Sequence, residues 1–188
     1  MIKQARRLSL AIALAAGLPL SLRAQEKPYT GLASSEDGTV YQFQLRVVQA
    51  GSGLDDVVGN RTGGGAGFSA MFGDMPLRLR LRMDGDAFEG KDGKGLVSTG
   101  GFGAEGVYFL PSYDWATPFL SCGAAFQRWD VSQNDVQTGD HSVVSYRLAG
   151  RAELGLRLGR RTLISLGVLI GKAGDGQTVT NAYLAVTL

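Results

Sequence analysis

The chain has 188 residues, enough for one domain or at most two, with a formal net charge of +2 and 28 glycines. Such a nearly balanced charge provides no broad basic surface, which argues against a nucleic-acid-binding protein. The single cysteine, Cys122, cannot form an internal disulfide, so a disulfide-stabilised exported fold is excluded as well.

Residues 1–24 are predicted to be a secretory signal peptide. A basic start at residues 1–7 precedes an apolar run at residues 8–22, which is too short for a comfortable membrane span. Ala24 then offers a small residue for cleavage. Removing this segment leaves 15 basic and 17 acidic side chains, a net charge of −2. Residues 25–38 form a polar lead-in to the remaining domain.

Eight strands are expected in the remaining domain, because apolar residues alternate with small or polar ones. The clearest is residues 77–84, where leucine and arginine alternate with a period of two. Successive side chains of a strand point to opposite faces, so this strand has one apolar face and one basic face. The expected strands are residues 39–50, 64–73, 77–84, 97–110, 116–129, 143–158, 162–171 and 178–188.

The connections between these strands alternate in length. Short links follow the second, fourth and sixth strands, whereas longer links cover residues 51–63, 85–96 and 130–142. Short turns at one end and long loops at the other are typical of an up-and-down barrel in the outer membrane.

The composition of the polar face indicates which side points inward. It is rich in glycine, serine and alanine, and the lysines beyond residue 24 fall in loops or at strand ends. Small residues suit the crowded interior of an eight-stranded barrel, so the apolar face is expected to meet lipid. The alternative is a soluble lipocalin-like binding barrel, which would bury Leu79 and expose Arg80.

Aromatic residues form two groups along the predicted strands, one near each end. Two such belts are expected at the interfaces of a membrane barrel. The group near the short turns is Tyr41, Phe72, Tyr108, Tyr113 and Trp115, and the group near the long loops is Phe126, Trp129 and Tyr146.

With this pattern, residues 39–188 resemble the small eight-stranded outer-membrane barrels, such as the transmembrane domain of outer-membrane protein A and outer-membrane protein X. The resemblance implies an all-β, antiparallel up-and-down transmembrane barrel in the bacterial outer membrane, monomeric and without a cofactor. It implies outer-membrane lipid, lipopolysaccharide and the barrel-assembly machinery as partners. Leu188 stands where such barrels usually end in an aromatic residue.

The inward-facing charges allow more than one function for the barrel. Two interpretations stay open: a non-enzymatic barrel with a structural or surface-interaction role, closed by a polar network, or a narrow anion-favouring pore. The pore is suggested because three acidic residues cannot neutralise seven arginines. The inward set is Arg46, Arg78, Arg80, Arg82, Arg147, Arg151 and Arg157 with Asp84, Glu105 and Glu153.

A lipid A-modifying enzyme is a third alternative. A serine nucleophile needs a histidine within hydrogen-bond reach. The only histidine, His141, lies beside Asp140 and Ser142, and adjacent residues of a strand point to opposite faces. The sequence therefore predicts no catalytic residues.

The acidic stretch that begins at Asp84-Gly85-Asp86 is predicted to be a hairpin loop. With Glu89 and Asp92 it suggests calcium binding, but the EF-hand spacing is missing, so no metal site is expected. Further acidic residues in the long loops predict an acidic outer rim: Asp55, Asp56, Asp130, Asp135 and Asp140.

Overall fold

The computed structural model describes residues 33–34, 38–51, 58–91, 95–111, 115–135, 139–172 and 178–188, with side chains for all of these except 33–34, 131–145 and 172. The predicted signal peptide and most of the lead-in lie outside these residues. Within them no helix is long and apolar enough to cross a membrane. The strands are β1 Ala33–Ser34, β2 Val40–Ala50, β3 Thr62–Phe72, β4 Leu77–Glu89, β5 Leu96–Phe109, β6 Ala116–Asp135, β7 Gly139–Leu158, β8 Thr162–Lys172 and β9 Thr178–Thr187.

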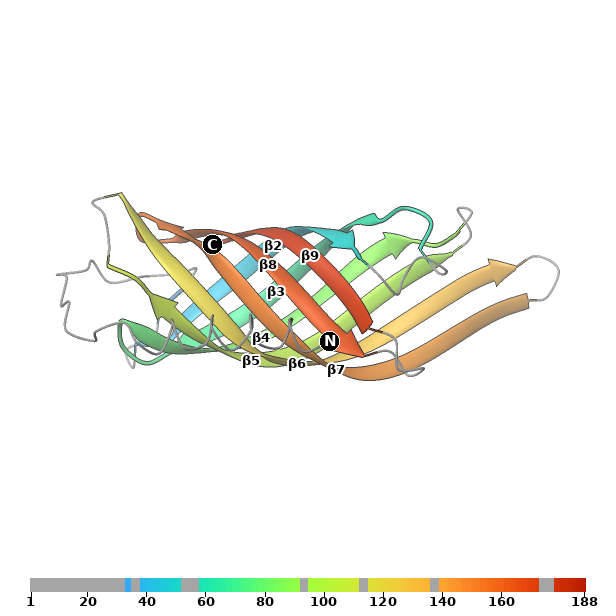
Figure 1. Ribbon diagram of the computed structural model, residues 1–188, viewed down its shortest axis with the longest axis horizontal. Helices are drawn as coiled ribbons and strands as arrows, with labels where there is room; N and C mark the ends of the chain where they lie inside the picture. Colours follow the sequence, from blue (N-terminus) through green and yellow to red (C-terminus); the bar gives the residue numbers. More distant parts are fainter. Residues whose placement is uncertain are drawn as a thin grey trace, which may run out of the picture.

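Strands β2 to β9 form a closed antiparallel barrel (Figure 1). Each strand pairs with the next along the chain, and β9 pairs with β2 between Gln44↔Thr187 and Ala50↔Asn181. The terminal Leu188 continues this seam through two backbone hydrogen bonds with Phe43. The predicted eight-stranded, all-β, up-and-down barrel is therefore confirmed. The short strand β1, which the sequence did not predict, pairs with Val40 and Tyr41 on the edge of β2 that β9 leaves uncovered.

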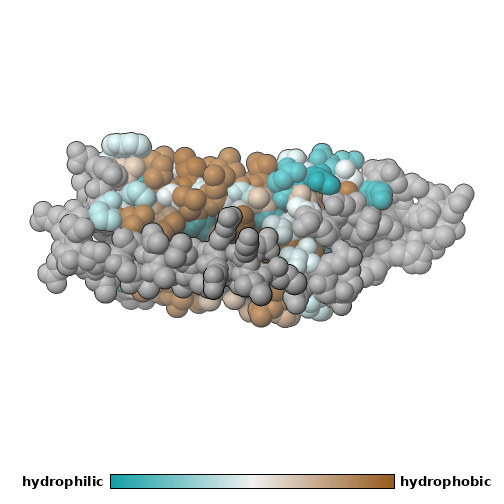
Figure 2. Space-filling view, viewed as in Figure 1, coloured by the Kyte–Doolittle hydropathy of each residue, from teal (hydrophilic) through white to brown (hydrophobic). Residues whose placement is uncertain are grey.

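The apolar side chains point outward and the polar side chains point into the barrel. Leu79 and Arg80 of β4 distinguish a membrane barrel from a soluble lipocalin-like barrel. Leu79 is 50% exposed, whereas Arg80 is 1% exposed. Large exposed apolar side chains occur on every strand from β2 to β9 and make up what we call the apolar belt. Figure 2 shows part of this belt in brown, with hydrophilic side chains toward the end where β6 and β7 extend. The structure contradicts the soluble lipocalin-like alternative, because most of the barrel wall would expose leucine, valine and phenylalanine to water.

Two of the three predicted long loops are wrong over much of their length. Strand β4 runs to Glu89, and Asp86 pairs with Thr99 of β5, so about half of the expected loop at residues 85–96 is sheet. Strands β6 and β7 pair as far as Asp135↔Gly139, so the expected loop at residues 130–142 is mostly a β-hairpin that projects beyond the other strands (Figure 1). In both places backbone pairing with the neighbouring strand outweighs the local preference of Gly, Asp and Asn for turns.

The interior is layered. One apolar cluster of Val40, Met71, Val107, Phe109, Phe119 and Leu163 occupies the short-turn end. A second cluster, which includes Val48, Phe88, Val97, Trp129 and Val179, occupies the opposite end. Buried charged residues fill the space between these two clusters, and they form the candidate site.

Candidate functional site

Strand β4 supplies half of the charges at the centre of the barrel. Its alternation directs Arg80, Arg82, Asp84 and Asp86 into the lumen, where all four are buried. The adjacent strands present small residues at this level, and these leave room for the long side chains. At Gly67, which pairs with Asp84, an added Cβ atom would lie only 2.9 Å from the Asp84 Cβ atom. The glycines on the polar face of the neighbouring strands thus leave the space that the long side chains of the arginine-rich strand occupy.

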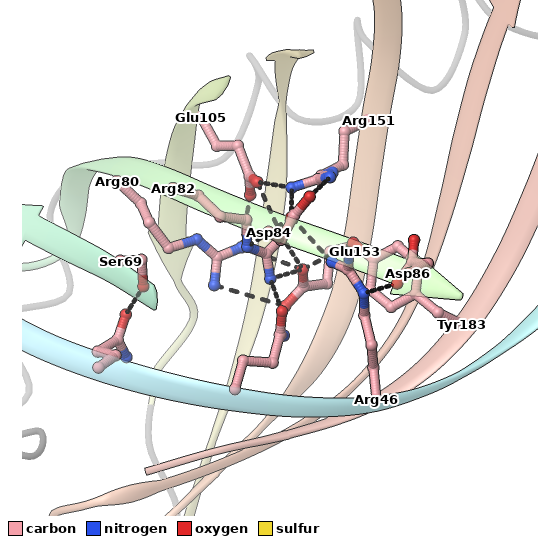
Figure 3. A network of polar contacts seen from close by, with 12 residues as sticks. Arg46, Ser69, Arg80, Arg82, Asp84, Asp86, Glu105, Arg151, Glu153 and Tyr183 are labelled. Carbon is pink, nitrogen blue, oxygen red and sulfur yellow. Dashed lines mark hydrogen bonds and ion pairs between the residues drawn. The ribbon is translucent and has the colours of Figure 1, made fainter. Parts of the chain in front are cut away.

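Eight side chains form a continuous set of ion pairs, which we call the ion-pair network (Figure 3). Each is at most 6% exposed. Four are arginines and four are carboxylates, so the network has no net formal charge. Its members are Arg46, Arg80, Arg82, Arg151, Asp84, Asp86, Glu105 and Glu153.

Glu105 of β5 lies at the centre of the contacts from β4 and β7. Its Oε1 atom accepts hydrogen bonds from Arg82 Nη1 at 2.9 Å and from Arg151 Nη1 at 3.2 Å. Its Oε2 atom accepts hydrogen bonds from Arg80 Nη2 and from the Ser121 hydroxyl, the latter at 3.1 Å. One carboxylate therefore accepts hydrogen bonds from three guanidinium groups.

Glu153 of β7 lies across the lumen from β4. Its Oε2 atom is 3.1 Å from both Arg80 Nη2 and Arg82 Nη1. The Tyr183 hydroxyl of β9 donates a hydrogen bond to the same oxygen at 2.9 Å. Arg82 also donates to Gln44 Oε1 of β2 at 2.6 Å. These bonds join strands that do not pair with one another in the sheet.

Asp84 and Asp86 complete the network toward the long-loop end of β4. Asp84 accepts hydrogen bonds from Arg46 Nη1 at 2.8 Å and from Arg151 Nη2 at 3.2 Å. Asp86 pairs with Arg46 Nε. The Arg46 guanidinium group lies over the Tyr183 ring, with Cζ 5.5 Å from the ring centroid. Arg46 of β2 is thereby held from both β4 and β9.

The arrangement crosses the lumen from β2, β4 and β5 to β7 and β9. A buried charge without a partner costs several kcal/mol, whereas here each guanidinium group meets at least one carboxylate. Within the described residues, no group of three or more histidine, cysteine, aspartate or glutamate side chains could hold a metal ion. The chemistry that this site supports is mutual neutralisation of the buried charges.

Three arginines of the predicted interior set lie outside the ion-pair network. Arg157 donates a hydrogen bond to Thr117 Oγ1 at 2.7 Å, and its guanidinium group lies over the ring of Phe109 at the short-turn end. Arg147 lies over the ring of Trp129, with Cζ 5.0 Å from the ring centroid. Arg78 is buried at the start of β4, next to the short turn that precedes this strand. These arginines sit in the two end layers, apart from the balanced centre.

The predicted interface aromatic residues that the structure describes point outward, with one exception. The prediction for Trp129 is wrong: it is 2% exposed and points into the barrel, because β6 alternates without a break from Leu120 and every odd-numbered position faces inward. Tyr113 lies outside the described residues. The outward-facing members of the two predicted groups are Tyr41, Phe72, Tyr108, Trp115, Phe126 and Tyr146.

The sequence reasoning missed Asp86 as a network residue because the Asp84-Gly85-Asp86 stretch resembled a loop. The available signal was the strict alternation of polar with small or apolar residues, which continues to Ala87. The contributions of Gln44, Ser121 and Tyr183 were missed as well, since no local pattern indicates which inward polar groups meet across a barrel. Asp84 and Asp86 are buried residues of β4 and do not lie in the predicted hairpin loop.

Several predicted features cannot be placed. Asp55, Asp56 and Asp92 lie outside the described residues, and so do the side chains of Asp135, Asp140, His141 and Ser142. Of the expected acidic rim, Asp130 is described, and it pairs with Arg128 at 3.0 Å on the surface.

The fold of this barrel occurs in bacterial outer-membrane proteins. No protein-family model and no curated protein matches the sequence. Among solved structures, Neisserial surface protein A is similar at a TM-score of 0.57 and 17% identity, covering 80% of this chain and 96% of that one. The chain has the fold of the small outer-membrane barrels.

Two further small outer-membrane barrels show the same likeness. The outer-membrane enzyme PagL has a TM-score of 0.56 and 13% identity, covering 78% of this chain and 98% of that one. Ail, the attachment invasion locus protein of Yersinia pestis, has a TM-score of 0.55 and 10% identity, covering 79% and 95%. One fold thus serves an enzyme and an attachment protein, so the function of this chain has to be argued from its own residues.

Proposed function

We propose that this protein is a closed, non-enzymatic barrel of the bacterial outer membrane with a structural or surface-interaction role. The observation that carries the proposal is the charge-balanced ion-pair network at the centre of the lumen. The apolar belt supports a location in lipid, where it would contact outer-membrane lipid and lipopolysaccharide. A closed eight-stranded barrel with no unpaired central strand edge fits a monomer in the membrane.

The layered interior supports a closed lumen over the narrow anion-favouring pore. An ion on a path through the barrel would have to cross an apolar cluster at each end and break ion pairs between them. The three inward-facing arginines beyond this balanced set are Arg78, Arg147 and Arg157. These residues lie in the end layers, so the centre has no excess of positive charge to attract an anion.

Single-channel recording tests the closed lumen. The full-length folded protein, reconstituted in planar bilayers under a salt gradient, should show no resolvable conductance. An anion-selective conductance of the unaltered protein would contradict the proposal.

Mass spectrometry of lipid A tests the non-enzymatic part. Cells that express the protein and cells from which its gene is deleted should have the same lipid A acylation pattern. A loss or gain of an acyl chain on expression would establish the enzyme instead. Heat-dependent migration of the membrane fraction in detergent gels tests the location, because a closed barrel resists unfolding by detergent until it is boiled.

A further inference from the structure

The seam of the barrel, where β2 meets β9, has an uneven end on the short-turn side. Strand β9 covers β2 as far as Leu188, which exchanges two backbone hydrogen bonds with Phe43. Strand β2 continues past this level to Val40, which still pairs with Met71 of β3 on its other edge. The first residues of β2 therefore have one edge that β9 does not cover.

Strand β1 takes the place that a longer β9 would occupy. Because Phe43 faces Leu188, the second position beyond Leu188 would face Tyr41. In the structure Tyr41 faces Ala33 of β1 instead. Both β1 and β9 are antiparallel to β2, so they run in the same direction along its edge. Strand β1 thus continues β9 in line, with one pairing position, opposite Gln42, between them.

The alternation of the antiparallel ladder turns the backbone of Tyr41 toward β1. In such a ladder, pairs of residues that exchange both hydrogen bonds alternate with pairs that exchange none. Phe43 and Leu188 exchange both, so the next such pair along this edge is Tyr41 with Ala33. The neighbouring residue Ser34 accordingly directs its N–H group away from β2.

These backbone groups lie where water is scarce. Tyr41 faces outward near the short turns, and its ring stacks on Phe68 with the ring centroids 6.1 Å apart. Outward aromatic side chains of this kind mark the border of the hydrocarbon layer. Backbone N–H and C=O groups without a partner are costly at that depth. Strand β1 supplies the partner that Tyr41 requires.

A glycine with a left-handed backbone lies between β1 and β2. Gly38 has a φ of 81°, a conformation that glycine adopts far more readily than other residues. An added Cβ atom there would meet nothing within 4 Å, so the backbone conformation and not crowding favours glycine. Gly38 follows Asp37, and both residue types are frequent in turns. The local sequence thus favours the reversal that brings β1 back along β2.

We propose that β1 is a latch that closes the short-turn end of the seam. All other neighbouring strands of the barrel are consecutive in the chain, whereas β2 and β9 are its first and last strands. The seam therefore has no connecting turn to hold its end together. By pairing with Tyr41, the latch keeps the seam from opening at this end. The proposal concerns closure of the barrel and goes beyond its proposed function.

Hydrogen exchange of single amides tests the latch in folded protein, in nanodiscs that hold one copy each. Ala33→Pro removes the N–H group that faces Tyr41, whereas Ser34→Pro removes one that faces away from β2 and is the matched control. Ala33→Pro should speed exchange of the Tyr41 amide at least about fivefold, with a smaller increase at Phe43 and none at Val47. Ser34→Pro should leave all three rates within about twofold.

A longer β9 tests the position of the latch without a proline. Adding Thr-Val-Thr after Leu188 extends β9 to the positions opposite Gln42, Tyr41 and Val40, where it competes with β1. The Ala33 amide should then exchange at least about tenfold faster, while the Tyr41 amide stays protected by its new partner. Adding a single threonine reaches only the position opposite Gln42 and should leave Ala33 unchanged.

The proposal is overturned if the Tyr41 amide of the unaltered protein exchanges as fast as in an unfolded chain. It is also overturned if the two folded proline variants behave alike, or if the longer β9 leaves Ala33 protected. Gel migration without boiling checks that each variant is folded, and the longer β9 decides alone if Ala33→Pro does not fold. None of these results depends on conductance or lipid A chemistry, so failure here is distinct from failure of the proposed function.

Discussion

The substitution Glu105→Gln removes one negative charge from the ion-pair network with little change in shape. Glu105 accepts from Arg82 at 2.9 Å and from Arg151 at 3.2 Å, and it also pairs with Arg80. At an effective dielectric constant of about 20, each of these contacts represents about 5–7 kcal/mol of gross attraction, which desolvation of the ions largely offsets. Removing one partner of a buried ion pair typically costs about 3–5 kcal/mol.

We therefore expect Glu105→Gln to lower the free energy of unfolding by about 3–5 kcal/mol. Four arginines would then share three carboxylates inside a barrel whose ends are apolar. The measurement is reversible urea unfolding in lipid vesicles, followed by tryptophan fluorescence and checked by gel migration without boiling. The matched control is Glu89→Gln on the exposed end of β4, which should change stability by less than about 0.5 kcal/mol.

A double variant separates charge balance from the loss of hydrogen bonds. Combining Glu105→Gln with Arg82→Met restores equal numbers of buried positive and negative charges. Replacing both partners of a buried pair is often nearly neutral, so the double variant should be more stable than Glu105→Gln alone. A loss below about 1 kcal/mol for Glu105→Gln, or a double variant less stable than that single one, would refute the charge-balance reasoning.

Three further predictions concern packing, orientation and lipid contact. Gly167→Ala should destabilise the barrel by about 1–3 kcal/mol, because its Cβ atom would clash with the Tyr183 ring inside the barrel; Gly106→Ala, with open space around its Cβ atom, should not. In single-tryptophan variants, brominated lipids should quench Trp115, which is 70% exposed, but not the buried Trp129. Leu154→Arg on the apolar belt should cost about 2–4 kcal/mol in vesicles.

Each of these predictions has an outcome that contradicts it. Equal stability of the two glycine variants would mean that Tyr183 does not pack against β8. Strong quenching of Trp129 by lipid bromine would place that residue on the wall instead of in the lumen. Leu96→Arg, near the long-loop end, should cost only about 0–1 kcal/mol, so an equal cost at Leu96 and Leu154 would contradict the assigned membrane depth.

The eight-stranded barrel and the direction of most side chains could be predicted from sequence because both depend on a period-two pattern. In residues 77–84 that pattern is unusually regular, and it correctly assigned Leu79 to lipid and Arg80 to the lumen. The same local reasoning failed where composition and pattern disagreed. Asp86 was assigned to a loop because aspartate and glycine favour turns, although the alternation continued through it.

Trp129 shows the opposite error. Its residue type suggested the membrane interface, although its parity with Ser121 and Gln127 indicated the lumen. In both cases the strand period was a better guide than the preference of the amino acid, because a strand cannot turn one side chain to the other face without shifting its register.

The sequence by itself determined the barrel, the lipid-facing surface and the identity of the inward arginines, since these follow from spacing along a single strand. Only the tertiary structure decided how those arginines are neutralised. Arg80 meets Glu153, and Arg46 meets Asp84 and Asp86, across 73, 38 and 40 positions of the chain. Such contacts depend on the tilt and closure of the barrel, which bring distant strands to the same level, and closure is a property of all eight strands together.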